Sequence, residues 1–143
     1  MSAEPKHAVS PSPSYNISLP VSVKSEFDCI VASFYRPGEQ TLLQLSSYVR
    51  SSGDQVGALV RLHERISKDA RTWRVWKEQL HADQNVDQAA ADYLDADGTF
   101  WVHACLVWPH LTIYVTLSGP MAAVEDQNNW AREALRSVRL TVN

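Results

Sequence analysis

Three apolar runs separated by tight-turn residues constrain this chain more than any other feature. The runs "VDQAAADYL", "TFWVHACLVW" and "LTIYVTL" meet at Asp97-Gly98 and at Pro109-His110. An aspartate-glycine pair accepts the positive φ angles of a hairpin turn, and the proline-histidine pair makes a second short reversal. Strands joined by such short turns pair antiparallel. The sequence therefore predicts an antiparallel meander over this region.

Alternating residues earlier in the chain predict more strands. Residues 15–23 place apolar side chains at every second position, with Pro20 suited to an edge strand. Residues 27–36 and 40–49 are rich in β-branched and aromatic residues and flank the turn "RPGE", which indicates a hairpin. A further alternating run begins at Trp73 and has tryptophans on both faces, so neither face is expected to be freely solvated.

Two segments have helical spacing. Within 51–71, Val56, Leu59, Val60 and Ile66 repeat at helical intervals, and Asp54 is expected to cap this helix. The last segment repeats Trp130, Ala134, Leu135 and Val138 at intervals of three and four, with Asn128 or Asn129 as the cap. The predicted class is α+β, with an antiparallel sheet of about six or seven strands flanked by helices.

Length and composition predict one folded domain. The chain has 143 residues, 45% hydrophobic and 20% charged, which suffices for a core without disulfides or metals. Residues 1–14 are poor in large apolar side chains and are expected to form a flexible Pro/Ser-rich tail before a domain over 15–143. Cys29 and Cys105 lie in apolar, strand-like runs and are expected to be reduced core thiols.

Targeting signals and membrane segments are not predicted. No apolar run approaches the length of a spanning helix, and the first residues have no apolar region typical of a secretory signal. We therefore expect a cytoplasmic protein with no membrane partner, either a monomer or a homodimer.

The segment "DADGTFWVHACLVWPH" raises the question of a metal site. Aligned on Gly98, a calcium loop would have Tyr93 as its first ligand and Ala104 as its twelfth, so two essential oxygens are missing. His103 and Cys105 share one strand face but supply only two ligands, because His110 lies beyond a turn. The motifs of nucleophile elbows, dinucleotide folds, phosphate loops and zinc proteases are also absent. We expect no metal, no cofactor and no enzyme activity.

Charge is unevenly distributed along the chain. From Glu78 to Ala131 there are eight acidic residues and no lysine or arginine, within a formal net charge of −3. This predicts an acidic surface for a basic protein partner, and disfavours nucleic acid because like charges repel phosphate. Tryptophans at such a surface are common binding hot spots. The candidate partner-binding residues are Asp83, Asp87, Asp92, Asp95, Asp97, Trp76, Trp101 and Trp108.

The order of these elements resembles the Mog1/PsbP-like fold. A strand, a hairpin and a long helix precede "RVWKEQL", "AAADYLDADGTFWVHACLVW" and "LTIYVTLSGP", and a helix with "WAREALRSVRL" closes the chain. Over Tyr15 to Leu140 the chain is similar to small DcrB-like bacterial proteins of that fold. The resemblance implies a role linked to type VI secretion, either as an immunity protein or as an Eag-type effector chaperone.

Three functional hypotheses follow. An immunity protein would occlude a cognate toxin, such as a basic nuclease, through the acidic residues. Reversing Asp92, Asp95 and Asp97 to lysine would then slow association while leaving the fold intact. A chaperone would present an exposed apolar groove with little salt dependence. The chain lacks the Trp-Asp pattern of such chaperones in its first strand, which favours the immunity role. The third hypothesis, an enzyme, would need titratable groups that converge in a pocket.

Overall fold

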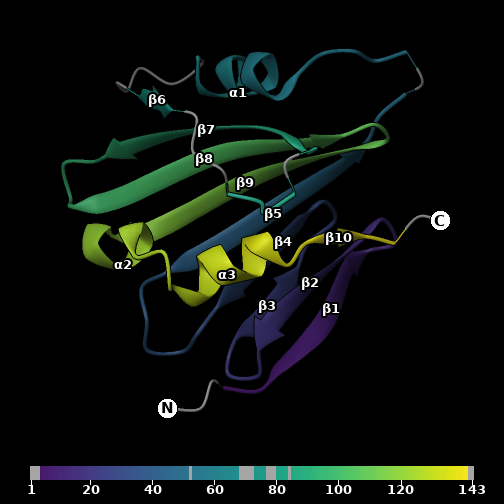
Figure 1. Ribbon diagram of the computed structural model, residues 1–143. Helices are drawn as coiled ribbons and strands as arrows, with labels where there is room; N and C mark the ends of the chain where they lie inside the picture. The colour runs from purple at the N-terminus through teal and green to yellow at the C-terminus, as the bar shows by residue number, and fades with distance from the viewer. Residues whose placement is uncertain (1–3, 52, 68–72, 77–79, 84, 142–143) are drawn as a thin grey trace.

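The computed structural model describes residues 4–51, 53–67, 73–76, 80–83 and 85–141. Seven strands form one sheet in which all neighbours are antiparallel. In spatial order they are β3 (Lys24–Phe27), β4 (Val31–Tyr35), β5 (Leu42–Val49), β9 (Leu111–Pro120), β8 (Thr99–Trp108), β7 (Asp87–Leu94) and β6 (Arg74–Trp76). The predicted α+β class with an antiparallel sheet is confirmed (Figure 1).

The predicted reversals occur at the expected residues. Gly98 has a φ of 85° in the turn between β7 and β8, and Gly38 has a φ of 87° between β4 and β5. Pro109 and His110 connect β8 to β9. Because glycine accepts positive φ without a steric penalty, these turns fix the register of the strands that they join.

The N-terminal segment belongs to the fold, so the expectation of a flexible tail over 1–14 is wrong for residues 6–12. β1 (Lys6–Ser12) pairs with one edge of β2 (Tyr15–Pro20), and β10 (Arg139–Leu140) pairs with the other. The Lys6 ammonium also lies 3.3 Å from the Glu133 carboxylate. β1 is held by backbone hydrogen bonds, which do not depend on side-chain type, so the composition of this segment could not predict its pairing.

The main core lies between the seven-stranded sheet on one side and the three-stranded sheet with two helices on the other (Figure 1). These helices are α2 (Met121–Glu125) and α3 (Trp130–Arg136). Strand residues that point inward, such as Ile17, Leu45 and Val115, are almost fully buried. The Asn129 side chain accepts a hydrogen bond of 2.8 Å from the amide of Ala131, so one of the two predicted caps is confirmed.

A third helix, α1 (Ala58–Ile66), packs on the opposite face of the seven-stranded sheet, over β7 and β8 (Figure 1). Its buried residues contact a second apolar cluster that includes Cys105. Leu59 and Val60, expected on the buried face, are about half exposed. The small residues of β7 accept one narrow row of helix side chains, so the wider apolar stripe predicted from the sequence is not covered.

The start of α1 also differs from the prediction. The N-cap residue is Gly57 and not the predicted Asp54, and glycine has no side chain that could cap the helix. The carboxylate of Asp87 on β7 instead accepts a 2.8 Å hydrogen bond from the Ala58 amide. Residues 68–71 of the predicted helix lie outside the described residues. No helix within the described residues has the length and apolar character of a membrane span.

Candidate functional site

The predicted acidic residues do not form one patch. Asp83 precedes β7 and Asp87 begins it, whereas Asp95 and Asp97 follow its other end. Eight strand residues at about 3.4 Å each place these two groups about 25 Å apart. Carboxylates that are close in the sequence therefore lie at opposite ends of β7.

Two of these carboxylates hold the fold together. Asp92 is only 6% exposed, and its oxygens accept hydrogen bonds of 3.1 and 2.6 Å from the Arg74 guanidinium. This hydrogen-bonded carboxylate raises the pKa of Arg74. Asp87 is exposed but caps α1. The prediction that Asp92 is an accessible contact residue is therefore wrong, because the sheet register turns its side chain toward the main core.

The hairpin turn uses a third carboxylate. One oxygen of Asp95 accepts hydrogen bonds of 2.9 Å from the amides of Asp97 and Thr99, and the other accepts the indole N–H of Trp101 at 3.0 Å. Asp95 is therefore a turn-forming residue, as Asx chemistry dictates. Reversal of Asp92 and Asp95 to lysine would remove contacts that support the fold, so we now expect these two substitutions to destabilise it.

The remaining predicted residues are dispersed. Asp83 and Asp97 are exposed, and Trp101 and Trp108 are half-buried, with Trp108 packed against the ring of His81. Trp76 lies in β6, but its side chain is outside the described residues. Asp83 and Trp108 line a common hollow with Arg136 and Arg139, so the carboxylate there is balanced by two cations.

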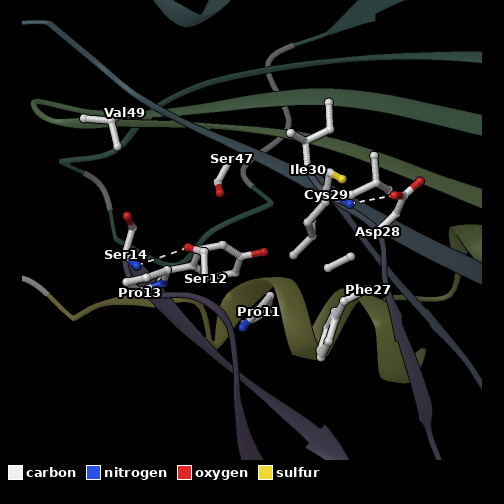
Figure 2. A pocket seen from close by; sticks show the side chains of 14 residues that line it. Pro11, Ser12, Pro13, Ser14, Phe27, Asp28, Cys29, Ile30, Ser47 and Val49 are labelled. Atoms are coloured by element: carbon white, nitrogen blue, oxygen red, sulfur yellow. Dashed lines mark hydrogen bonds between the residues drawn. The ribbon is translucent and has the colours of Figure 1, made fainter.

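The three large apolar side chains with the highest exposed fractions among the described residues lie elsewhere, around one hollow. A groove of about 260 Å³ is lined there by residues 11–15, residues 27–32 and the β5 residues Leu45, Ser47 and Val49. Figure 2 shows Phe27 and Ile30 on one side of this groove and the Pro11–Ser14 turn on another. We call this feature the inter-sheet groove.

Two turns build the walls of the inter-sheet groove. In the first, the Ser14 amide donates to the Ser12 hydroxyl, and the Ser14 carbonyl accepts from Thr141 beside β10. In the second, the Asp28 amide donates to the Val31 carbonyl, and the Asp28 carboxylate accepts from the Cys29 amide. Both turns are held by local hydrogen bonds, so the groove is a formed feature of the fold.

The second turn interrupts the strand predicted over 27–36. Cys29 is exposed there, so its expected place in the core is wrong. The exposed fractions are 55% for Phe27, 59% for Ile30 and 78% for Val49. Apolar side chains gathered at a hollow are typical of a protein-binding surface. No sequence signal marks this site, because these residues fit the alternation of a buried strand equally well.

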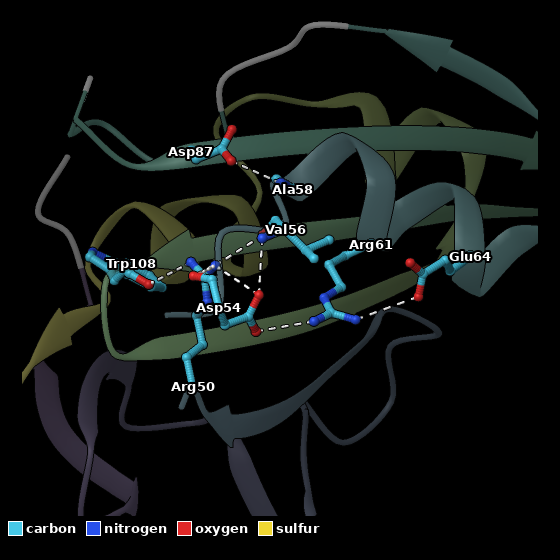
Figure 3. A network of polar contacts seen from close by, with 8 residues as sticks. All are labelled: Arg50, Asp54, Val56, Ala58, Arg61, Glu64, Asp87 and Trp108. Atoms are coloured by element: carbon cyan, nitrogen blue, oxygen red, sulfur yellow. Dashed lines mark hydrogen bonds and ion pairs between the residues drawn. The ribbon is translucent and has the colours of Figure 1, made fainter. Parts of the chain in front are cut away.

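A polar network fixes the β5 end of the groove from the other face of the sheet (Figure 3). The guanidinium of Arg50, which follows Val49, donates to the carbonyls of Trp108, Asp54 and Val56 at 2.7–3.1 Å. The Val56 amide, and then Arg50, hold the pKa of Asp54 below its usual range by hydrogen bonding. The network therefore clamps the chain where β5 leaves the sheet.

Metal ligands and reactive thiols were the alternative candidates in the described part of the chain. There, no group of three histidine, cysteine or carboxylate side chains is placed to hold a metal ion. Burial raises the pKa of the Cys105 thiol to about 12, which disfavours the nucleophilic thiolate. The inter-sheet groove therefore remains the candidate site, and its lining suits contact with apolar side chains.

Comparison with known proteins supports the fold alone. No protein-family model and no curated protein matches the chain. The chain is similar to a protein from Bacteroides thetaiotaomicron whose crystal structure has been determined, with a TM-score of 0.60 and 10% identity. The similarity covers 99% of this chain and 50% of the other, so the chain spans half the length of that protein. The resemblance to Mog1/PsbP-like and DcrB-like proteins stays a prediction.

Proposed function

We propose that the protein is a cytoplasmic chaperone that holds an apolar segment of a partner protein in the inter-sheet groove, in the manner expected of an Eag-type effector chaperone. The observation that carries this proposal is the exposure of Phe27, Ile30 and Val49 around one hollow. Large apolar side chains that gather at one hollow are typical of a surface that a partner covers, because covering them removes apolar area from water.

The size and charge of the groove support a polypeptide as the occupant. Its volume of about 260 Å³ lies below the range of about 300–1,000 Å³ typical of small-molecule pockets. Among the described residues that line it, Asp28 is the one with a charge, and its carboxylate accepts a hydrogen bond from the Cys29 amide. A groove of this kind can accept one or two apolar side chains from a chain that continues beyond it.

A light-scattering assay tests this function. The probe is a lysine-flanked peptide of about 20 apolar residues, rich in valine and alanine, which aggregates on dilution into buffer. We expect the protein to suppress scattering at near-equimolar ratio. The double variant Phe27→Ser/Ile30→Ser should need about tenfold more protein, because it removes most of the exposed apolar surface of the groove.

A matched control separates the groove from general hydrophobicity. Val60 on α1 and Leu94 on β7 are 54% and 51% exposed, close to Ile30 and Phe27, but lie away from the groove. Val60→Ser/Leu94→Ser should therefore leave suppression unchanged. Equal loss in both double variants, or no suppression by the unaltered protein, would rule the proposal out.

An immunity protein is the second candidate. The half-buried Trp108 at the hollow beside Asp83 favours it, since an aromatic side chain at a hollow is a common hot spot for a protein partner. With Asp92 buried and Asp95 tied into its turn, the acidic contact would rest on Asp83, Asp87 and Asp97. This candidate predicts that added salt releases the partner, whereas groove binding withstands salt.

A further inference from the structure

The end of β5 presents an unpaired edge beside the inter-sheet groove. β9 pairs with β5 along its whole length, but β4 pairs only with Leu42 to Ser46. Beyond that point the chain turns from β4 back into β3, where the Asp28 amide donates to the Val31 carbonyl. Among the described residues, no strand lies on the β4 side of Ser47 and Val49.

The alternation of hydrogen bonds along β5 shows which of its backbone N–H and C=O groups face this open side. The Arg50 amide donates to the His110 carbonyl, beside the Val49 and Leu111 pair of β5 and β9. In an antiparallel ladder the residues alternate between the two neighbours. Tyr48 therefore bonds toward β9, whereas Ser47 and Val49 direct their N–H and C=O groups to the side that β4 leaves open.

Side chains on this edge alternate between two surfaces. Ser47 and Val49 line the inter-sheet groove. Tyr48 points to the opposite face, where its ring packs edge-on against Tyr114 at a centroid distance of 5.6 Å. An unpaired edge beside an apolar pocket is the arrangement that recognises an added strand, since the backbone supplies affinity and the pocket selects alternate side chains.

We propose that Ser47 and Val49 pair with an extended, apolar segment of the partner, which adds a strand in line with β4 and places alternate side chains in the groove. This inference rests on the proposed function and specifies the conformation of the bound segment. The partner residues that face the groove are expected to be uncharged, because Asp28, the one charged residue among the described lining residues, already accepts a hydrogen bond from the Cys29 amide. Residues that face Tyr48 can be polar, because that side is exposed.

Two methylated probes test for strand pairing. The parent probe is an acetylated peptide of alternating threonine and valine, about seven residues long. One copy carries N-methyl groups on its valines and the other on its threonines. A bound strand directs alternate amides to the same edge, so one copy should bind at least about tenfold more weakly while the other binds like the parent.

Amide hydrogen exchange locates the contact within the protein. With the parent probe, the amides of Ser47 and Val49 should gain at least about tenfold protection. The amides of Ser46 and Tyr48, which already bond to β9, should stay unchanged and serve as internal controls. Unchanged exchange at Ser47 and Val49, or equal binding of both methylated copies, would overturn the inference.

A proline variant provides a third readout. Val49→Pro removes the amide that faces the open side and leaves the β9 ladder intact, so probe affinity should fall about tenfold. Val49→Thr keeps that amide and should weaken binding by less than about threefold, with the unfolding midpoint of each variant measured alongside. If Phe27→Ser/Ile30→Ser still weakens chaperone activity as expected while these tests fail, the bound segment is not a strand but the groove function stands. If that double variant has no effect, the proposed function itself fails.

Discussion

The two ends of the seven-stranded sheet differ in what covers them. At the β6–β8 end, α1 seals one face, and Asp87 and Asp92 are engaged by the Ala58 amide and by Arg74. At the β3–β5 end, exposed apolar side chains surround a groove and the β5 edge is unpaired. The end richest in acidic residues is thus the structural end, whereas the groove at the other end, where Asp28 is the one charged residue among the described lining residues, is suited to binding.

Thiol reactivity gives the largest expected contrast between the ends. Cys29 is exposed at the groove, whereas Cys105 is buried under α1 and burial raises its pKa to about 12. We expect a disulfide reagent to label one thiol at once, and the other more than about a thousandfold more slowly, because it needs local opening. Cys29→Ser should abolish the fast phase, and two thiols of similar rate would contradict the contrast.

Arg50 gives the largest expected change in stability. Its side chain is 9% exposed and donates to three backbone carbonyls as well as to Asp54. Arg50→Met leaves those acceptors unsatisfied and should lower the free energy of unfolding by about 3 kcal/mol in urea titration. Arg65→Met removes only a cation contact 4.7 Å from the Tyr114 ring centroid and should cost less than about 1 kcal/mol. Equal losses would show that the network does not clamp β5.

Asp87 tests whether the acidic run is structural. Asp87→Ala removes the acceptor for the Ala58 amide at the start of α1, and should cost about 1 kcal/mol in the free energy of unfolding. Asp97→Ala, at an exposed turn position, should change it by less than about 0.5 kcal/mol. If the order of the two variants were reversed, the structural role of Asp87 would be wrong.

Asp54 gives the smallest expected effect, which depends on pH. Its pKa is lowered in the folded state by the Val56 amide first and by Arg50 next. Its contribution to stability is therefore complete above the pKa of an unfolded aspartate and is lost as pH falls through the folded-state pKa. Asp54→Asn should flatten the acid limb of stability measured against pH. An unchanged acid limb would mean that the carboxylate contributes nothing there.

Local turn chemistry explains which parts of the fold could be predicted. Asp97-Gly98 and Pro37-Gly38 dictate their reversals through φ preferences, and Asn129 caps α3 through its own side chain. Each of these preferences acts within a few residues, so it can be recognised in the sequence alone. The central meander and the antiparallel class follow from these signals.

Long-range contacts explain what could not be predicted. β1 is recruited by the backbone of β2, and α1 is capped by Asp87, twenty-nine positions from Ala58. The inter-sheet groove combines residues from three separate segments, and its opening depends on where β4 stops. The acidic run misled the prediction because a strand spreads adjacent carboxylates over two ends and two faces.

Photo-crosslinking in the source cell tests the central claim most directly. A benzoylphenylalanine residue replaces Ile30 at the groove in one protein and Asp97 at the opposite end in another, two exposed positions. We predict that Ile30→benzoylphenylalanine forms a crosslink to an apolar segment of one partner polypeptide, mapped by mass spectrometry, and that Asp97→benzoylphenylalanine forms none. A crosslink to a basic partner at position 97, with none at position 30, would contradict the account and favour the immunity role.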